Sequence, residues 1–141
     1  MEPKRQRLRR LRTSRLQLDY YWIESVTLKS NPDEPESPRQ IADLSYAVAH
    51  ADLPEPDRDE RLARLRIRTP RGALLKTGLE LDLTIVGRFS IKGGKVDADA
   101  VQLLKFNGPA ILYGVARGII SSLTAISGSG RTDLPSANFV D

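Results

Sequence analysis

Residues 108–126, GPAILYGVARGIISSLTAI, are the most apolar stretch of this 141-residue chain, and Arg117 is their only charge. Gly108 and Pro109 suit the cap and the first position of a helix. We therefore expect a helix from Pro109 to Ile126, about 27 Å long at 1.5 Å per residue. That length could span a membrane, but the central arginine argues against a span.

Small residues form a stripe along this expected helix, beside two apolar faces. A helix that is apolar nearly all round is buried on more than one side, and one sheet can cover only one of them. We therefore predict that a second subunit covers the other side, where small side chains permit close approach. The residues expected at this oligomer interface are Gly114, Gly118, Ser121, Ser122 and Ala125.

Before the helix, apolar and polar residues alternate as they do in half-buried strands. We expect four strands: LQLDYYWIESVTLK (16–29), IADLSYAVAHAD (41–52), a third around residues 64–68, and LELDLTIVGRFSI (79–91). In the first strand the even-numbered residues are mostly apolar, which predicts that they share one face. Proline-rich turns separate the strands. The predicted fold is α+β, a four-stranded antiparallel sheet followed by a long helix.

Two further local patterns bear on this fold. AVQLLKF (100–106) predicts a short separate helix, capped by Asp97 or Asp99, before the chain restarts at Pro109. In the third strand, Arg64, Arg66 and Arg68 share a face opposite Leu65 and Ile67. We expect these arginines to pair across the ladder with Glu80 and Asp82, at a few tenths of a kcal/mol per pair.

The positive charge is concentrated at the N-terminus. Residues 1–15, MEPKRQRLRRLRTSR, hold seven basic residues and one acidic residue, whereas residues 16–141 hold fifteen basic and seventeen acidic residues. We expect a basic arm over 1–15 and one domain over 16–141. The arm could contact RNA, DNA or an acidic protein, and weak nucleic-acid binding stays open as an alternative. No charged region leads directly into an apolar signal core, so a cytoplasmic protein is expected.

The residue types that most enzymes need are scarce. The chain has no cysteine, His50 is its only histidine, and no phosphate-cradling loop occurs. No base is evident that could activate Ser121 or Ser122. We therefore expect no catalytic residues, no metal, no cofactor and no enzymatic activity.

Four phrases, in this order, resemble the SecB family of protein-export chaperones and its toxin–antitoxin-associated relatives. They are VGRFSI (86–91), GPAILYGVAR (108–117), ISSL (120–123) and LPSANFVD (134–141), and the resemblance spans residues 16–141. It implies an ATP-independent holdase, typically a dimer of dimers, that holds unfolded clients in apolar grooves. Its implied partners are preproteins or an antitoxin, with a translocation motor as a further partner.

The resemblance also indicates which residues bind clients, although the sequence does not separate groove from core. The candidates are Tyr20, Trp22, Leu44, Tyr46, Val48, Ile119, Leu123, Ile126, Leu134 and Phe139. The chain departs from the export chaperones in its three strand arginines, where those proteins present an acidic face. Its N-terminal arm is more like the antitoxin-associated branch. A partner-specific interaction module is the other alternative.

Overall fold

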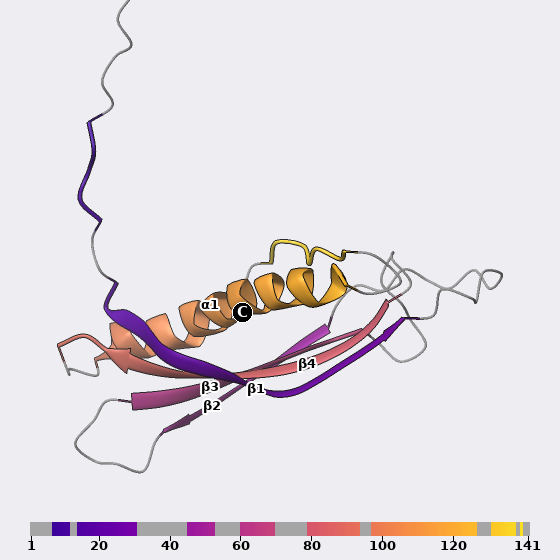
Figure 1. The fold of residues 1–141 in the computed structure, drawn as a ribbon. Helices are drawn as coiled ribbons and strands as arrows, with labels where there is room; N and C mark the ends of the chain where they lie inside the picture. The colour runs from indigo at the N-terminus through magenta and orange to yellow at the C-terminus, as the bar shows by residue number, and fades with distance from the viewer. Residues whose placement is uncertain are drawn as a thin grey trace, which may run out of the picture.

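The chain folds into one antiparallel sheet crossed by one long helix. A computed structural model describes residues 7–11, 14–30, 45–52, 60–69, 79–93, 97–126, 131–137 and 139. The strands are β1 (Leu16–Ser30), β2 (Ser45–Asp52), β3 (Glu60–Arg68) and β4 (Leu79–Ile91), and helix α1 (Ala98–Thr124) follows them. The sheet has the order β1-β4-β3-β2, and every neighbouring pair is antiparallel. Figure 1 shows α1 lying on one face of the curved sheet.

The alternation predicted for β3 and β4 is observed. In β4 the odd-numbered residues from Leu79 to Ile91 are all buried, and they belong to the face that α1 covers. Leu65 and Ile67 of β3 lie opposite Ile85 and Leu83 of β4 on this same face. Apolar side chains at every second position therefore form the layer on which the helix packs.

In β1 the prediction of a single even-numbered apolar face is wrong. The pairing with β4 shifts between Leu18 and Tyr20 and again between Ile23 and Ser25. Each shift adds one residue to β1 and so reverses the faces of the residues that follow it. Leu16, Leu18, Val26 and Leu28 face the helix as expected, but Tyr20 and Trp22 are turned to the outer face of the sheet. Tyr21 and Ile23 take their place, opposite Gly87 and Ile85.

The second correction concerns the two helices expected on either side of Pro109, which form one continuous helix. Its buried residues recur every four positions, and Gly108 belongs to this series: Ala100, Leu104, Gly108, Leu112, Ala116, Ile120 and Thr124. A proline inside a helix costs about 3 kcal/mol. Gly108 has no Cβ to clash with the proline ring, and one straight helix places the whole buried stripe against the sheet, which offsets that cost. The helix also ends at Thr124, two residues before the expected Ile126.

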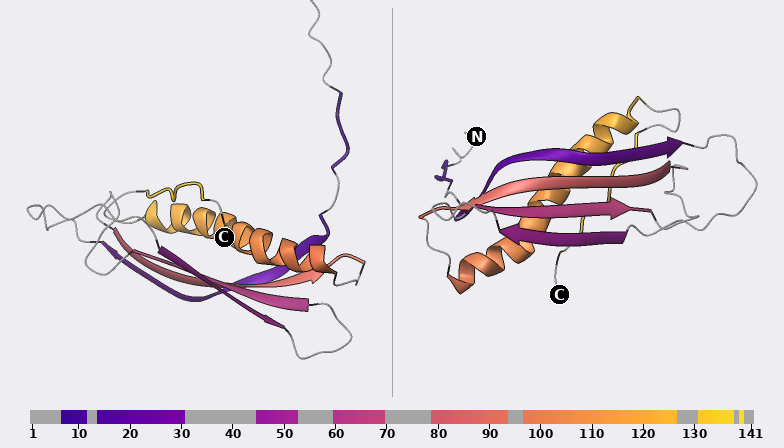
Figure 2. Two further views of the ribbon diagram at one scale, coloured as in Figure 1. Left: turned by 180° about the vertical axis from the view of Figure 1, so that it is seen from behind. Right: turned by 90° about the horizontal axis from the view of Figure 1, so that it is seen from below.

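The helix crosses the sheet obliquely (Figure 2, right), and Leu112 of α1 lies directly over Gly87 of β4. A Cβ on Gly87 would lie 2.6 Å from Leu112 Cδ2 and 2.9 Å from Phe89 Cε2. The absence of a side chain at this position therefore allows α1 to pack directly on β4. At the N-terminus of α1, Asp97 is the helix cap, since its carboxylate accepts a hydrogen bond from the Ala100 amide at 2.8 Å.

Candidate functional site

The two flanks of α1 differ in what covers them. On the flank nearer β1, a groove of about 570 Å³ is lined by Tyr21, Gly114, Val115, Gly118, Ile119, Ser122 and Leu123. We call this the open flank. Ile23 and Val26 of the same strand are also about two-fifths exposed, and β1 is an edge strand of the sheet. The open flank is therefore an apolar surface between an edge strand and a helix.

On the other flank, residues 131–137 and 139 run back along α1, and we call them the C-terminal segment (Figure 2). Leu134 is 2% exposed and Phe139 is 8% exposed. The Phe139 ring packs edge-on against Tyr113 of α1 and Tyr46 of β2, with centroid distances of 5.5 and 4.8 Å. We call this covered side the closed flank.

Side chains of α1 hold the main chain of the C-terminal segment. The Tyr113 hydroxyl donates to the Pro135 carbonyl, and Arg117 Nε donates to the Leu134 carbonyl at 3.0 Å. Nearer the helix end, the Thr132 amide donates to the Thr124 hydroxyl at 2.7 Å. Burial raises the pKa of Tyr113, and the nearby Arg117 opposes this shift, so the phenol stays protonated and able to donate.

A third exposed cluster lies on the outer face of the sheet. The rings of Tyr20 and Trp22 are 5.6 Å apart between centroids and are tilted by 30°. Arg88 lies 5.6 Å from the Tyr20 centroid and donates to its hydroxyl at 3.0 Å. The two aromatic side chains are therefore packed against each other and against a guanidinium group, on the side of the sheet away from α1.

The arginines of β3 make ion pairs on this outer face. Arg66 donates to both carboxylate oxygens of Asp82, at 3.0 and 2.8 Å, as expected from the sequence. These hydrogen bonds hold the pKa of Asp82 below its usual value. Arg64 instead reaches Glu24 on β1, with 2.7 Å between Nε and the carboxylate oxygen. Glu24 lies at the second register shift of β1, so the strand pattern did not identify this partner.

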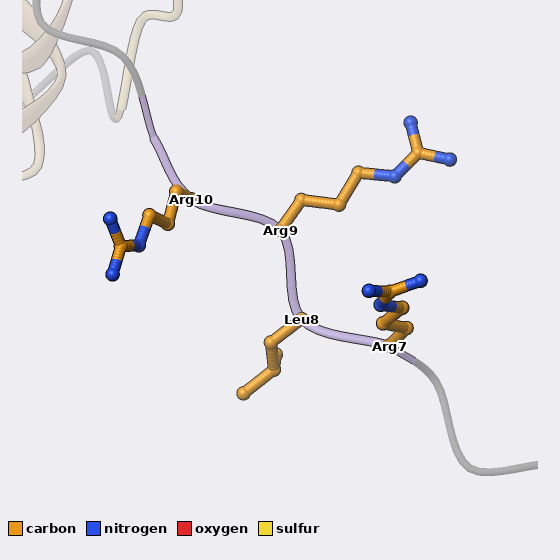
Figure 3. A pocket seen from close by; sticks show the side chains of 4 residues that line it. All are labelled: Arg7, Leu8, Arg9 and Arg10. Atoms are coloured by element: carbon orange, nitrogen blue, oxygen red, sulfur yellow. The ribbon is translucent and has the colours of Figure 1, made fainter.

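The described part of the basic arm carries Arg7, Arg9 and Arg10, all exposed. Together with Leu8 they line a hollow of about 680 Å³ (Figure 3). One extended segment forms this hollow, and its arginine side chains point in different directions (Figure 3). The arm therefore presents cationic groups along a strand-like chain. Its junction with the domain is fixed, since Arg15 bonds to the Asp97 carboxylate at 3.2 Å.

The structure distributes the predicted client-binding residues over several places. Ile119 and Leu123 line the open flank, Tyr46, Leu134 and Phe139 belong to the closed flank, and Tyr20 and Trp22 lie on the outer face. Val48 is half-buried on β2, and Ile126 is 88% exposed just beyond the helix. Leu44 lies outside the described residues.

The predicted small-residue stripe is also divided. Gly114, Gly118 and Ser122 line the open flank, whereas the Ser121 hydroxyl donates to Asp133 at 3.0 Å on the closed flank. Ala125 is exposed at the end of the helix. Tyr21, Tyr113 and Arg117 were not identified as site residues. Tyr21 faces the helix because of the two register shifts in β1. In the sequence these shifts are marked only by the acidic residues at positions 19 and 24, on either side of the aromatic run.

Two further observations on the described residues concern metal binding and membrane spans. Across them, no group of three or more His, Cys, Asp or Glu side chains could hold a metal ion. In this same part of the chain, no helix is long and apolar enough to cross a membrane.

The described residues form an α+β fold, an antiparallel sheet with a long helix on one face. A Mycobacterium tuberculosis SecB-like chaperone, solved in complex with a ChAD peptide from the HigA1 antitoxin, is similar in structure, with a TM-score of 0.58 and 14% identity over 88% of each chain. A protein of unknown function from Streptococcus agalactiae has a TM-score of 0.55 and 13% identity over 88% of this chain and 99% of its own. No family model and no curated protein matches the sequence. The SecB-like fold expected from the sequence is therefore confirmed.

Proposed function

We propose that the protein is an ATP-independent holdase chaperone that binds non-native polypeptide segments in the cytoplasm. The observation that carries this proposal is the open flank, an uncovered apolar groove beside an edge strand. The similar fold of a SecB-like chaperone that was solved with an antitoxin peptide supports it, although a fold alone does not define an activity. The domain over residues 16–141 carries this function, and residues 1–15 form an accessory arm.

The mechanism follows from the chemistry of the open flank. Its side chains are aromatic, aliphatic or small, so a client is bound by removing apolar surface from water, at about 25 cal/mol per Å². This interaction is non-directional and tolerates many client sequences. It needs no nucleotide, no nucleophile and no metal. Clients are therefore apolar segments of unfolded preproteins or of an antitoxin, and an export role would add a translocation motor as a partner.

Assembly is the second part of the proposal, and we place it at the small residues of α1, so that Tyr21, Ile119 and Leu123 beside this contact remain available to clients. A Cβ on Gly114 or Gly118 would meet no atom within 4 Å, so this surface is open to another backbone. We propose a homotetramer, a dimer of dimers, with Gly114, Gly118, Ser121, Ser122 and Ala125 near the contact. Light scattering should give a mass well above the 15.7 kDa of one chain, and Gly118→Leu should reduce it. A monomer at micromolar concentration would contradict the assembly proposal.

Aggregation assays test the holdase function. The protein should slow aggregation of several unrelated unfolded proteins at stoichiometric ratios, without ATP and at high salt, because apolar burial is insensitive to ionic screening. Leu123→Lys, in the groove, should reduce this activity. Val101→Lys is the matched control, since Val101 is exposed on α1 but does not line the groove. Equal loss in both variants, or no suppression by the unmodified protein, would refute the assignment.

The exposed arginines of the arm favour a second candidate function, weak binding of nucleic acid without sequence preference. Each phosphate contact on a single strand should contribute about 0.7 to the slope of log K against log salt. Replacing Arg7, Arg9 and Arg10 with alanine should therefore weaken RNA or DNA binding and flatten its salt dependence, while aggregation suppression is retained. Tight, sequence-selective binding would instead make nucleic-acid recognition the main function.

A further inference from the structure

The C-terminal segment lies on the closed flank in the way that an extended peptide lies in a binding cleft. It is described as neither helix nor strand, and it follows α1 back from the helix end (Figure 1). Its side chains have two kinds of environment. Leu134 and Phe139, five residues apart, are buried, whereas Pro135, Ser136 and Ala137 between them are exposed.

Two side chains of α1 donate to the main chain of the segment in this cleft, and the Ser121 hydroxyl donates to the Asp133 side chain. Tyr113 and Arg117 donate to the carbonyl groups of Pro135 and Leu134. Every residue of an extended polypeptide offers such a carbonyl, so these two hydrogen bonds do not depend on the sequence that is bound. In peptide recognition, main-chain hydrogen bonds supply affinity and side-chain pockets supply specificity. The closed flank has both the hydrogen bonds to the main chain and the buried positions for apolar side chains.

From this geometry we infer that the closed flank is a peptide-binding cleft and that the C-terminal segment is its internal ligand. The inference rests on the proposed function and deepens it, because it names a second client site and its ligand class. That ligand is an extended polypeptide with two large apolar side chains five residues apart. The first side chain replaces Leu134, and the second replaces Phe139 between the rings of Tyr46 and Tyr113.

The contacts of the C-terminal segment explain how a client peptide can replace it in the cleft. Near its start, the buried hydrogen bond from the Thr132 amide to Thr124 fixes it to the helix end. Beyond this point, two apolar anchors and three side-chain donors of α1 hold it; the donors are Ser121, Tyr113 and Arg117. A tethered ligand competes at an effective concentration in the millimolar range. A free client therefore binds with an apparent affinity reduced by the fraction of time that the segment occupies the cleft.

A labelled peptide with the sequence of residues 131–139, RTDLPSANF, tests the inference by fluorescence anisotropy. In the full chain, Phe139→Ala weakens the internal ligand and should tighten binding of this peptide about tenfold. Phe106→Ala is the matched control, because Phe106 is a half-buried phenylalanine on α1, seven residues or about 10 Å along the helix axis from Tyr113, which contacts Phe139. It should leave the affinity unchanged. A peptide with aspartate in place of both anchors should not bind.

The unsubstituted chain gives an independent test by NMR. Excess unlabelled peptide should move the amide signals of Leu134, Ala137 and Phe139 toward those of a free chain, while the signals of β3 and β4 stay in place. Unchanged signals at saturating peptide, or equal peptide affinity for the unmodified chain and a folded Phe139→Ala variant, would overturn the inference. If the peptide displaces the C-terminal segment but the protein does not suppress aggregation, the holdase function is rejected and the peptide-binding cleft is retained. If the protein suppresses aggregation but the peptide does not displace the segment, the cleft is rejected and the holdase function is retained.

Discussion

The closed flank and the open flank are two sides of helix α1 that differ in what covers their apolar side chains. Both carry apolar surface next to the sheet. On the closed flank the chain covers this surface itself, with Leu134 at 2% exposure, whereas on the open flank Leu123 remains 37% exposed and Ile119 is half-buried. Of the fifteen residues after Ile126, those that the structure describes cover only the closed flank. Under the proposed function, a client or a second copy of the chain would cover the open flank.

This difference predicts how substitutions on the two flanks change the stability of the free chain. We expect closed-flank residues to contribute to this stability, since their contacts are formed within the chain. We expect open-flank residues to contribute less to it and more to binding, because their apolar surface would be removed from water only in a complex. Adjacent residues of α1 should thus respond differently to the same substitution.

The largest expected effect compares two neighbouring isoleucines. Ile120 is fully buried, and its carbonyl accepts a hydrogen bond from Thr124 beside the closed flank. Ile120→Ala should lower the free energy of unfolding by about 2–5 kcal/mol. Ile119→Ala, on the open flank, should cost clearly less and should reduce aggregation suppression. Urea denaturation at one fixed protein concentration measures both, and equal losses of stability would show that Ile119 belongs to the core as Ile120 does and not to an open flank.

Replacing each of two glycines with alanine should change the stability of the fold in opposite directions. At Gly87 an added methyl group would meet Leu112 at 2.6 Å, so Gly87→Ala should destabilise the fold by about 1–3 kcal/mol through overpacking. At Gly118 there is open space, and Gly118→Ala should stabilise the helix by about 0.5–1 kcal/mol. Thermal unfolding of both variants tests this, and destabilisation by Gly118→Ala would show that the surface is already in close contact in the assembled protein.

The smallest expected effect is the pH dependence of the closed flank. Hydrogen bonds from Arg131 and Ser121 hold the pKa of Asp133 below its ordinary value of 3.8. A carboxylate with a depressed pKa stabilises the folded state above the unfolded pKa, and this contribution is lost as pH falls through the folded value. The protection factors of the amide hydrogens in the C-terminal segment, which correct for the intrinsic pH dependence of exchange, should therefore be constant near neutral pH and should fall below about pH 4. Asp133→Asn should reduce this acid dependence, and an unchanged dependence would assign it to other carboxylates.

Much of the fold could be predicted because its signals are local. The alternation around Leu65 and along residues 79–91 has the period of a strand, and the apolar residues after Pro109 have the period of a helix. Ile119 and Leu123 became candidate client-binding residues through the resemblance to the SecB family and not through these patterns. The patterns could not identify Tyr21, because its position depends on two extra residues in β1 that change the register with β4.

The sequence by itself determined the strands, the apolar helix, the basic arm and the absence of cysteine, since each depends on residue type or on near-neighbour spacing. Only the tertiary structure decided that α1 continues through Pro109, that Tyr20 and Trp22 face outward, and that the C-terminal segment covers one flank. The physical reason is that each of these outcomes is a balance between a local cost and the burial of surface against residues far away in the chain. At Gly87 the missing side chain leaves the space that the helix needs, since an added Cβ would lie 2.6 Å from Leu112 Cδ2.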